Sequence, residues 1–162
     1  MPFADQRVKS SGFPKREFGK SFTEPSVCKS CQAVYLNKRW YFDPQLYREQ
    51  KGKAEKIICP GCQKVADRSF DGVVYLKGSL LKTRKEEIIN LIKKEEQKER
   101  EKNVLSRIGK MESRGKEMEV YTTTQFLATR LGHAIYKAFS GELKIKPAPR
   151  EAFVRVYWER EE

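Results

Sequence analysis

Long apolar runs are absent from this chain of 162 residues. A membrane-spanning helix needs about 20 predominantly apolar residues in succession, and the densest apolar cluster, residues 88–92, is short and interrupted by Asn90. Residues 1–20 are polar and lack the apolar core segment of a secretion signal. The sequence therefore predicts a cytoplasmic protein with no membrane partner.

Sequence patterns of common enzymes are also missing. The chain has a single histidine, His133, and lacks a Gly-rich phosphate loop, a GxSxG nucleophile and an HExxH helix. Paired carboxylates occur only within Lys/Glu tracts, where solvation explains them. His133 is expected on a helix surface, on the side away from Leu131 and Ile135. The sequence thus predicts no catalytic residues, no enzyme activity and no small-molecule substrate.

Acidic residues are fewer than basic ones. The chain contains 34 Lys and Arg against 22 Asp and Glu, a net charge of +12. The excess is spread evenly, with 14 basic against 8 acidic residues up to Gly72 and 20 against 14 after it. Such an excess favours a polyanionic partner, chiefly nucleic acid. The alternative, a solvated Lys/Glu-rich surface, predicts a more balanced charge.

Cysteine occurs only four times, in the two CxxC pairs Cys28–Cys31 and Cys59–Cys62. Each pair supplies two thiolates from one tight turn, and two such turns complete a tetrahedron around Zn²⁺. The 27 residues between the pairs suit a zinc ribbon, in which a hairpin separates two knuckles. Four thiolates leave no open position for water or substrate, so we expect one structural zinc ion.

Two other uses of the cysteines stay open at this point. Four cysteines can form two disulfides, although a cytoplasmic protein keeps its thiols reduced. One CxxC motif can do thioredoxin-like redox chemistry, but that motif belongs to a βαβ context, which neither pair has.

The pattern divides the chain into three regions: a flexible arm (1–25), the zinc ribbon (26–70) and an α+β domain (71–162). In the arm, basic residues alternate with phenylalanines, which can either dock on RNA or pack onto the chain's own domain. In the ribbon we expect a hairpin over 33–41 with its turn at Asn37-Lys38, a short helix or loop over 43–55, and a strand over 56–58.

The third region alternates strand and helix patterns. Its expected elements are a strand at 73–77, a helix from Ser79 to about Lys102, a hairpin of 105–112 with 117–122, a helix from Thr123 or Thr124 to Phe139, and strands at 142–146 and 152–158. This order, β-α-β-β-α-β(-β), matches the ferredoxin-like plan in its first six elements. Beyond Ile92 the long helix has no apolar stripe and is expected to project into solvent.

In that plan, two helices cover one face of the sheet and leave the other open. Alternation in the last strand directs Val154, Val156 and Trp158 to one face and Phe153, Arg155 and Tyr157 to the other. Aromatic and cationic side chains on an exposed sheet can stack on bases and bind phosphates. The alternative is that these aromatics pack against the ribbon or a second subunit. The candidate nucleic-acid contacts are Lys29, Lys38, Arg39 and Lys64 near the knuckles, and Tyr75, Tyr121, Lys144, Lys146, Phe153, Arg155 and Tyr157 on the sheet.

Several segments carry a resemblance to a known family. They are residues 24–31, 33–35, Arg39-Trp40, Cys59–Cys62, 87–96, 122–124 and 127–132. Over about residues 20–160 the chain resembles an uncharacterised bacterial family of small zinc-ribbon proteins. More remotely, it is similar to the N-terminal zinc-binding region of the archaeal and eukaryotic export adaptor of the large ribosomal subunit, which has more CxxC pairs.

The resemblance implies an association with the ribosome or with RNA. Together with the charge, it leads to the expectation of a zinc-stabilised RNA-binding protein that acts on ribosomal RNA or an assembling ribosome, with ribosomal proteins as further candidate partners. The alternative is a protein-interaction adaptor that uses the open sheet face and the long charged helix, with a purely structural zinc.

Overall fold

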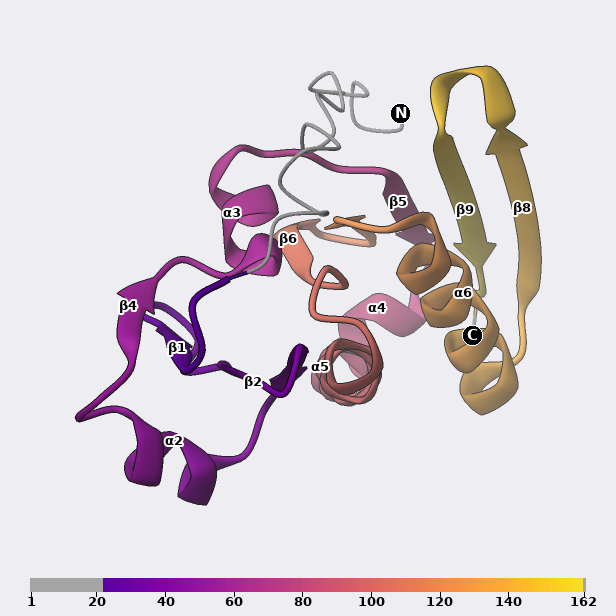
Figure 1. The fold of residues 1–162 in the computed structure, drawn as a ribbon. Helices are drawn as coiled ribbons and strands as arrows, with labels where there is room; N and C mark the ends of the chain where they lie inside the picture. The colour runs from indigo at the N-terminus through magenta and orange to yellow at the C-terminus, as the bar shows by residue number, and fades with distance from the viewer. Residues whose placement is uncertain (1–21, 162) are drawn as a thin grey trace.

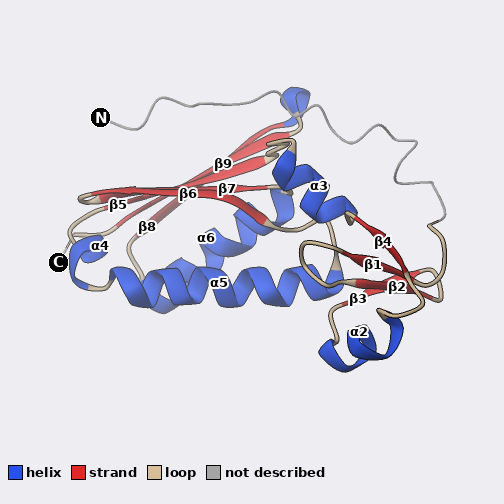
Figure 2. Cartoon of the chain, turned by 90° about the vertical axis from the view of Figure 1, so that its left-hand side faces the viewer, coloured by secondary structure: helices blue, strands red, loops and turns tan. Residues whose placement is uncertain are grey.

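The computed structural model describes residues 22–161, which form two β-sheets and the helices that pack on them (Figure 1). Most of the predicted arm, residues 1–21, lies outside the described residues. A four-stranded sheet with strand order β3-β2-β1-β4 is built from the ribbon region, and a five-stranded sheet with order β6-β7-β5-β9-β8 follows it. The two sheets lie at opposite ends of the molecule's long dimension (Figure 2).

The ribbon sheet is made of very short strands. Its elements are β1 (Ser26–Cys28), β2 (Val34–Leu36), β3 (Arg39–Tyr41), α2 (Pro44–Gln50), β4 (Glu55–Ile57) and α3 (Pro60–Ala66). Strand β1 pairs antiparallel with β2 and parallel with β4. That pairing brings the end of β1, which carries Cys28, beside the end of β4, two residues before Cys59.

The predicted hairpin of residues 33–41 is confirmed as β2 and β3, with Leu36 opposite Arg39. Its two turn residues, Asn37 and Lys38, both have positive φ, 53° and 63°. A two-residue turn of this kind matches the right-handed twist of the strands that it joins. The helix or loop expected after it is α2, where the Asp43 side chain accepts hydrogen bonds from the backbone N–H groups of Gln45 and Leu46.

The second sheet and its helices form the larger part. The elements are β5 (Gly72–Lys77), α4 (Leu80–Thr83), α5 (Lys85–Lys102), β6 (Ile108–Arg114), β7 (Glu117–Thr122), α6 (Gln125–Phe139), β8 (Glu142–Ala148), the 3₁₀ turn η1 (Pro149–Glu151) and β9 (Phe153–Glu159). The single helix predicted from Ser79 is thus two helices, separated at Arg84, whose φ of −126° is not helical. Helices α5 and α6 lie on one face of the sheet (Figure 2).

The strand order corrects the ferredoxin-like prediction. In that plan, the strand after the second helix pairs with the first strand, whereas here β9 lies between β5 and β8 and runs parallel to β5. The residues of the two strands explain why β9, and not β8, lies next to β5. Strand β9 buries Val154, Val156 and Trp158, as an interior strand requires. Strand β8 alternates charged side chains and contains Pro147, features suited to an edge.

The main core fills the space between the sheet and the two helices. It includes Val74 and Leu76 of β5, Ile88 and Ile92 of α5, and Leu131 of α6, all less than 2% exposed. The alternation predicted for β9 is confirmed, because Val154, Val156 and Trp158 belong to this core. We refer to the opposite face of the sheet, turned away from α5 and α6, as the outer face.

The prediction that α5 projects into solvent beyond Ile92 is wrong. Glu95 and Glu99 of this half are 8% and 3% exposed, because Arg130 of α6 lies against them, with Nε 2.9 Å from Glu95 Oε2 and 3.2 Å from Glu99 Oε1. The Glu96 carboxylate accepts a hydrogen bond from the Ile108 backbone N–H. Charged side chains on both helices therefore do the packing that an apolar stripe would otherwise do.

Among residues 22–161, no helix combines the length and the apolarity that crossing a bilayer requires.

Candidate metal centre

The first CxxC turn follows strand β1. The Cys28 N–H donates to the Ala33 carbonyl (2.8 Å), and the Gln32 N–H donates to the Cys28 carbonyl (3.1 Å). Gln32 has a φ of 65°, which turns the chain back toward β2. The Lys29 N–H donates to the Ile57 carbonyl (2.8 Å), so the turn is held against the end of β4. The backbone thereby carries both cysteines of this pair toward the second pair.

The second CxxC turn is the start of α3. Cys59 is the N-cap residue, Pro60 occupies the first turn, and the Cys59 sulfur accepts a hydrogen bond from the Cys62 N–H (3.4 Å). The Cys59 N–H in turn donates to the Cys28 sulfur (3.3 Å). Backbone N–H groups aimed at cysteine sulfurs stabilise the negative charge that a metal-bound thiolate carries.

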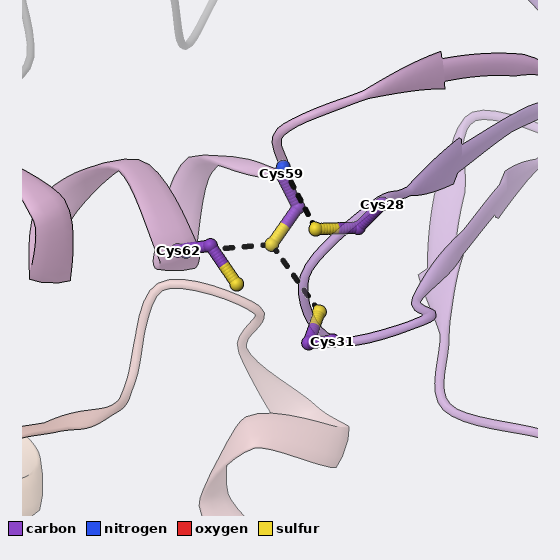
Figure 3. A group of neighbouring side chains, drawn as sticks. All are labelled: Cys28, Cys31, Cys59 and Cys62. Carbon is purple, nitrogen blue, oxygen red and sulfur yellow. Dashed lines mark hydrogen bonds between the residues drawn. The ribbon is translucent and has the colours of Figure 1, made fainter.

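The four sulfurs point toward a common centre, two from each turn (Figure 3). All four Sγ atoms lie within 4.8 Å of one another, and Cys31 Sγ is 3.6 Å from Cys59 Sγ. A tetrahedron with metal–sulfur bonds of about 2.3 Å has sulfur–sulfur edges of about 3.8 Å. The donor set and its spacing therefore fit a four-thiolate metal site, and the cluster can hold a metal ion.

All four cysteines are free, so the structure contains neither of the disulfides that the sequence left open. The cluster is also well shielded, since Cys28 and Cys59 are fully buried and Cys31 and Cys62 are half-buried. Trp40 and Phe42 pack against it.

The thiols affect one another's ionisation strongly. Hydrogen bonds from Cys31, Cys59 and Cys62 hold the pKa of Cys28 below the ordinary thiol value. The pKa of Cys59 is raised, chiefly because its thiol is hydrogen-bonded to Cys28. The cluster thus resists full ionisation by itself, and a divalent cation removes this conflict by compensating the thiolate charges.

A residue from outside the ribbon completes the centre. Arg107, in the segment between α5 and β6, is 6% exposed and donates to three sulfurs: Nη1 to Cys62 Sγ (3.4 Å), and Nη2 to Cys31 Sγ and Cys59 Sγ (3.5 Å each). Burial alone would lower the pKa of Arg107, but the negative charge on the cysteines, led by Cys59, outweighs burial and raises that pKa. Arg107 is therefore a buried cation in contact with three of the four sulfurs.

Lys64 makes the reverse connection, from α3 of the ribbon to the larger part. It is 5% exposed, and its Nζ donates to the Thr123 carbonyl (2.6 Å) and to Asp71 Oδ2 (3.1 Å). The prediction that Lys64 contacts phosphates is thereby corrected. A buried ammonium that is already paired with a carboxylate and a carbonyl is not available to an external anion.

The other basic residues predicted near the knuckles are on the surface. Lys29, Lys38 and Arg39 are all exposed. The Lys38 backbone N–H donates to the Glu24 carboxylate (2.5 Å), and the Lys38 ammonium takes no part in this hydrogen bond.

The outer face brings together five of the seven residues predicted on the sheet. Tyr75 stands opposite Tyr157, which stands opposite Lys144, and Arg155 stands opposite Lys146. The two tyrosine rings stack with centroids 5.0 Å apart and planes 18° apart, and Lys146 Nζ lies 5.3 Å from the Tyr157 ring centroid. We call these five residues the tyrosine patch. A groove of about 320 Å³ runs beside it, lined by both tyrosines and both lysines together with Glu117 and Glu142.

Two predicted contacts on the same face are buried. Tyr121 is 2% exposed, with its hydroxyl donating to the Glu119 carboxylate (3.2 Å), and Phe153 is 1% exposed. Together with Phe70 and Val73 they form a second, smaller apolar cluster on the outer face. Their rings are packed in this cluster, so the prediction that they stack on bases is corrected.

The sequence analysis did not identify Arg107 or Thr123. Through their contacts with the cysteine sulfurs and with Lys64, these two residues form what we call the junction between the ribbon and the larger part. The predicted hairpin strand over 105–112 includes Arg107, whereas β6 begins only at Ile108. Nothing in the local sequence distinguishes Arg107 from the chain's many other basic residues. Its role depends on a contact with cysteines 45 to 76 positions away.

Comparison with protein-family models, with curated proteins and with solved structures found no match to this chain.

Proposed function

We propose that the cysteine cluster binds one structural Zn²⁺ ion and that the protein binds RNA through the tyrosine patch and the exposed basic residues of the ribbon. Thiolate donors in tetrahedral arrangement favour Zn²⁺ over harder cations such as Mg²⁺ and Ca²⁺. Zinc with four thiolates has no open position for substrate, so the ion here would organise the ribbon and take no part in a reaction.

The groove beside the tyrosine patch is the observation that carries the RNA proposal. Its lining combines the rings of Tyr75 and Tyr157 with Lys144 and Lys146, and Arg155 stands opposite Lys146 on the neighbouring strand. Single-stranded nucleic acids are bound by this combination, in which aromatic rings contact bases and cations contact phosphates. The ion pair of Lys144 with Glu142 (3.6 Å) is long and exposed, and such surface pairs are weak enough for Lys144 to contact a phosphate instead.

The net charge of +12 supports the same proposal, since each phosphate contact releases counterions and adds affinity for a polyanion. The ribbon and the β8–β9 hairpin lie at opposite ends of the molecule (Figure 1). Lys29, Lys38 and Arg39 at one end and the tyrosine patch at the other therefore suit an extended or folded RNA. Ribosomal RNA, in a ribosome or an assembling particle, is the partner that we infer from the resemblance of the ribbon segments.

The test is RNA affinity as a function of salt, measured by fluorescence anisotropy with a single-stranded RNA. The double variant Lys144→Glu/Lys146→Glu is compared with Lys93→Glu/Lys94→Glu, which changes the net charge equally on exposed positions of α5. Loss of two phosphate contacts should reduce the slope of log K against log[salt] by about 1.4. We expect that reduction for the first variant only. Equal effects of the two variants would show that the tyrosine patch is not the binding site.

The adaptor alternative predicts a different result. An adaptor would retain its partners from a cell lysate after nuclease treatment, whereas an RNA-binding protein would lose those held through RNA. The structure weakens one argument for an adaptor, because the charged half of α5 is packed against Arg130 and the β6 backbone. Retention of all partners after nuclease treatment would favour the adaptor.

A further inference from the structure

The contact between the ribbon and the larger part is centred on Arg107, whose backbone is held tightly by the larger part. Its N–H donates to Thr123 Oγ1 (2.7 Å), and its carbonyl accepts from the Thr123 N–H (2.9 Å). The Thr123 hydroxyl also donates to the Leu105 carbonyl (2.5 Å), and Thr123 is fully buried. The guanidinium therefore reaches the sulfurs from a backbone position that belongs to the larger part.

The ribbon approaches this segment at its second CxxC turn. A Cβ atom on Gly61 would lie 2.0 Å from the Val104 carbonyl oxygen and 3.1 Å from the Arg107 guanidinium. Only a residue without a side chain permits this approach. Two guanidinium groups also lie near the Phe42 ring of the ribbon, with Arg100 at 5.0 Å and Arg107 at 5.1 Å from its centroid.

Charge explains why an arginine stands at this point. Four thiolates with one divalent ion carry a net charge of about −2, and a buried charge is costly unless it is paired. Arg107 is buried, donates to three of the sulfurs and supplies one compensating positive charge. Lys64 crosses the junction in the other direction, toward Thr123 and Asp71.

From this geometry we propose that Arg107 is a positioning residue of the metal centre, and that it couples metal binding to the docking of the ribbon on the larger part. A bound ion would hold the four sulfurs close together, so that three of them can accept hydrogen bonds from the guanidinium at the same time. Without the ion, the backbone hydrogen bonds still bring the two turns together, but the four sulfurs lose their common ligand and the thiolate charge that Arg107 compensates. By thermodynamic linkage, metal and docking must stabilise each other by the same factor.

This inference rests on metal binding by the cysteines but is independent of RNA binding. The test uses the full chain loaded with Co²⁺, whose absorption reports thiolate coordination, and then measures Zn²⁺ affinity by competition with a chelator. Arg107→Met is compared with Arg100→Met, which removes the other arginine on Phe42. Arg107 bonds three sulfurs, whereas Arg100 contacts the ribbon at the Phe42 ring.

We expect Arg107→Met to bind Zn²⁺ about 10- to 100-fold more weakly, the usual effect of removing a group that supports metal ligands. Arg100→Met should stay within about twofold of wild type, because it leaves the metal ligands and their hydrogen bonds intact. The thiolate-to-cobalt charge-transfer band should also move to longer wavelength in Arg107→Met alone. A positive hydrogen-bond donor lowers the energy of sulfur lone pairs, and its removal raises that energy.

Arg107→Lys keeps the charge and the aliphatic stem, and provides the measurement if the Met variant does not fold. One ammonium cannot reproduce the planar fork of a guanidinium, so its affinity and band position should lie between those of wild type and Met. A Lys variant equal to wild type in both, or a Met variant equal to Arg100→Met, would overturn the proposal. Absence of a thiolate–cobalt band in wild type would overturn it too, together with the metal assignment.

Discussion

Gly61 is a residue at which the cysteine cluster comes close to the backbone of the larger part. It lies between Cys59 and Cys62, in the turn that presents both sulfurs, and it touches the Val104 carbonyl across the junction. The turn does not require positive φ there, since Gly61 is not among the residues with a left-handed backbone. Glycine is needed here for lack of space, because any Cβ would overlap the Val104 carbonyl oxygen. A backbone oxygen cannot move aside by changing a side-chain rotamer.

We predict that Gly61→Ala destabilises the protein by about 1–3 kcal/mol, the usual cost of inserting an atom into a packed site. The 2.0 Å overlap with Val104 forces the second CxxC turn away from Arg107, so Zn²⁺ affinity should fall as well. Chemical denaturation and chelator competition measure the two effects.

Gly52→Ala is the matched control, since a Cβ at Gly52 meets nothing within 4 Å. At such a position alanine leaves stability unchanged or raises it by up to about 1 kcal/mol. If Gly61→Ala behaves like Gly52→Ala, the close approach at the junction does not matter to the centre.

Among the elements, α5 is the helix whose environment differs most from the one that its sequence predicts. Its second half reads as a solvated, charged helix, yet it buries two glutamates against α6. Arg130 is the partner that both glutamates share. Two lysines lie farther off, with Lys98 Nζ 3.6 Å from Glu95 Oε1 and Lys102 Nζ 3.8 Å from Glu99 Oε1. The charge network therefore replaces apolar packing between the two helices.

Replacing Arg130 by Met should destabilise the protein by about 3 kcal/mol. That is the lower end of the cost of leaving buried charges without their partner, since Lys98 and Lys102 remain. Urea unfolding at neutral pH measures the loss.

The triple variant Arg130→Met/Glu95→Gln/Glu99→Gln should recover most of this stability, because it removes the unpaired charges as well. No recovery in the triple variant would mean that Arg130 acts through packing of its stem.

The sequence predicted the elements whose signals are local. The CxxC spacing indicated that the four cysteines come together, the Asn37-Lys38 turn indicated the ribbon hairpin, and the alternation of β9 indicated its buried face. Each of these depends on residues close together in the chain.

Features that depend on distant partners were not predictable in the same way. The position of β9 between β5 and β8, the burial of Glu99 and the contact of Arg107 with the sulfurs are all decided by tertiary pairing. Lys64 shows the same limit, because its sequence context beside Cys62 looks like an exposed knuckle, and only Asp71 and Thr123 make it a buried cation.

On the scale of the whole molecule, the cysteine cluster lies where the ribbon meets the larger part. Its four sulfurs come from the ribbon, and the buried cation that contacts them comes from the larger part. The four-stranded ribbon sheet has strands of only three residues, which bury too little surface to fold without additional support. Metal binding would supply that support as folding free energy.

Removal of the metal should therefore affect the two parts unequally. With a chelator under reducing conditions, backbone amides of residues 26–66 should lose hydrogen-exchange protection. Amides of β5, β7 and β9, which surround the main apolar core, should keep theirs.

Metal content and thiol reactivity report directly on the proposed zinc site, and both are measured on one sample, by elemental analysis and by mass spectrometry after alkylation under native conditions. We expect one zinc ion per chain, with all four thiols unreactive until a chelator is added and all four alkylated afterwards. A chain that contains no metal while its four cysteines react freely, or one that carries two disulfides, would contradict it.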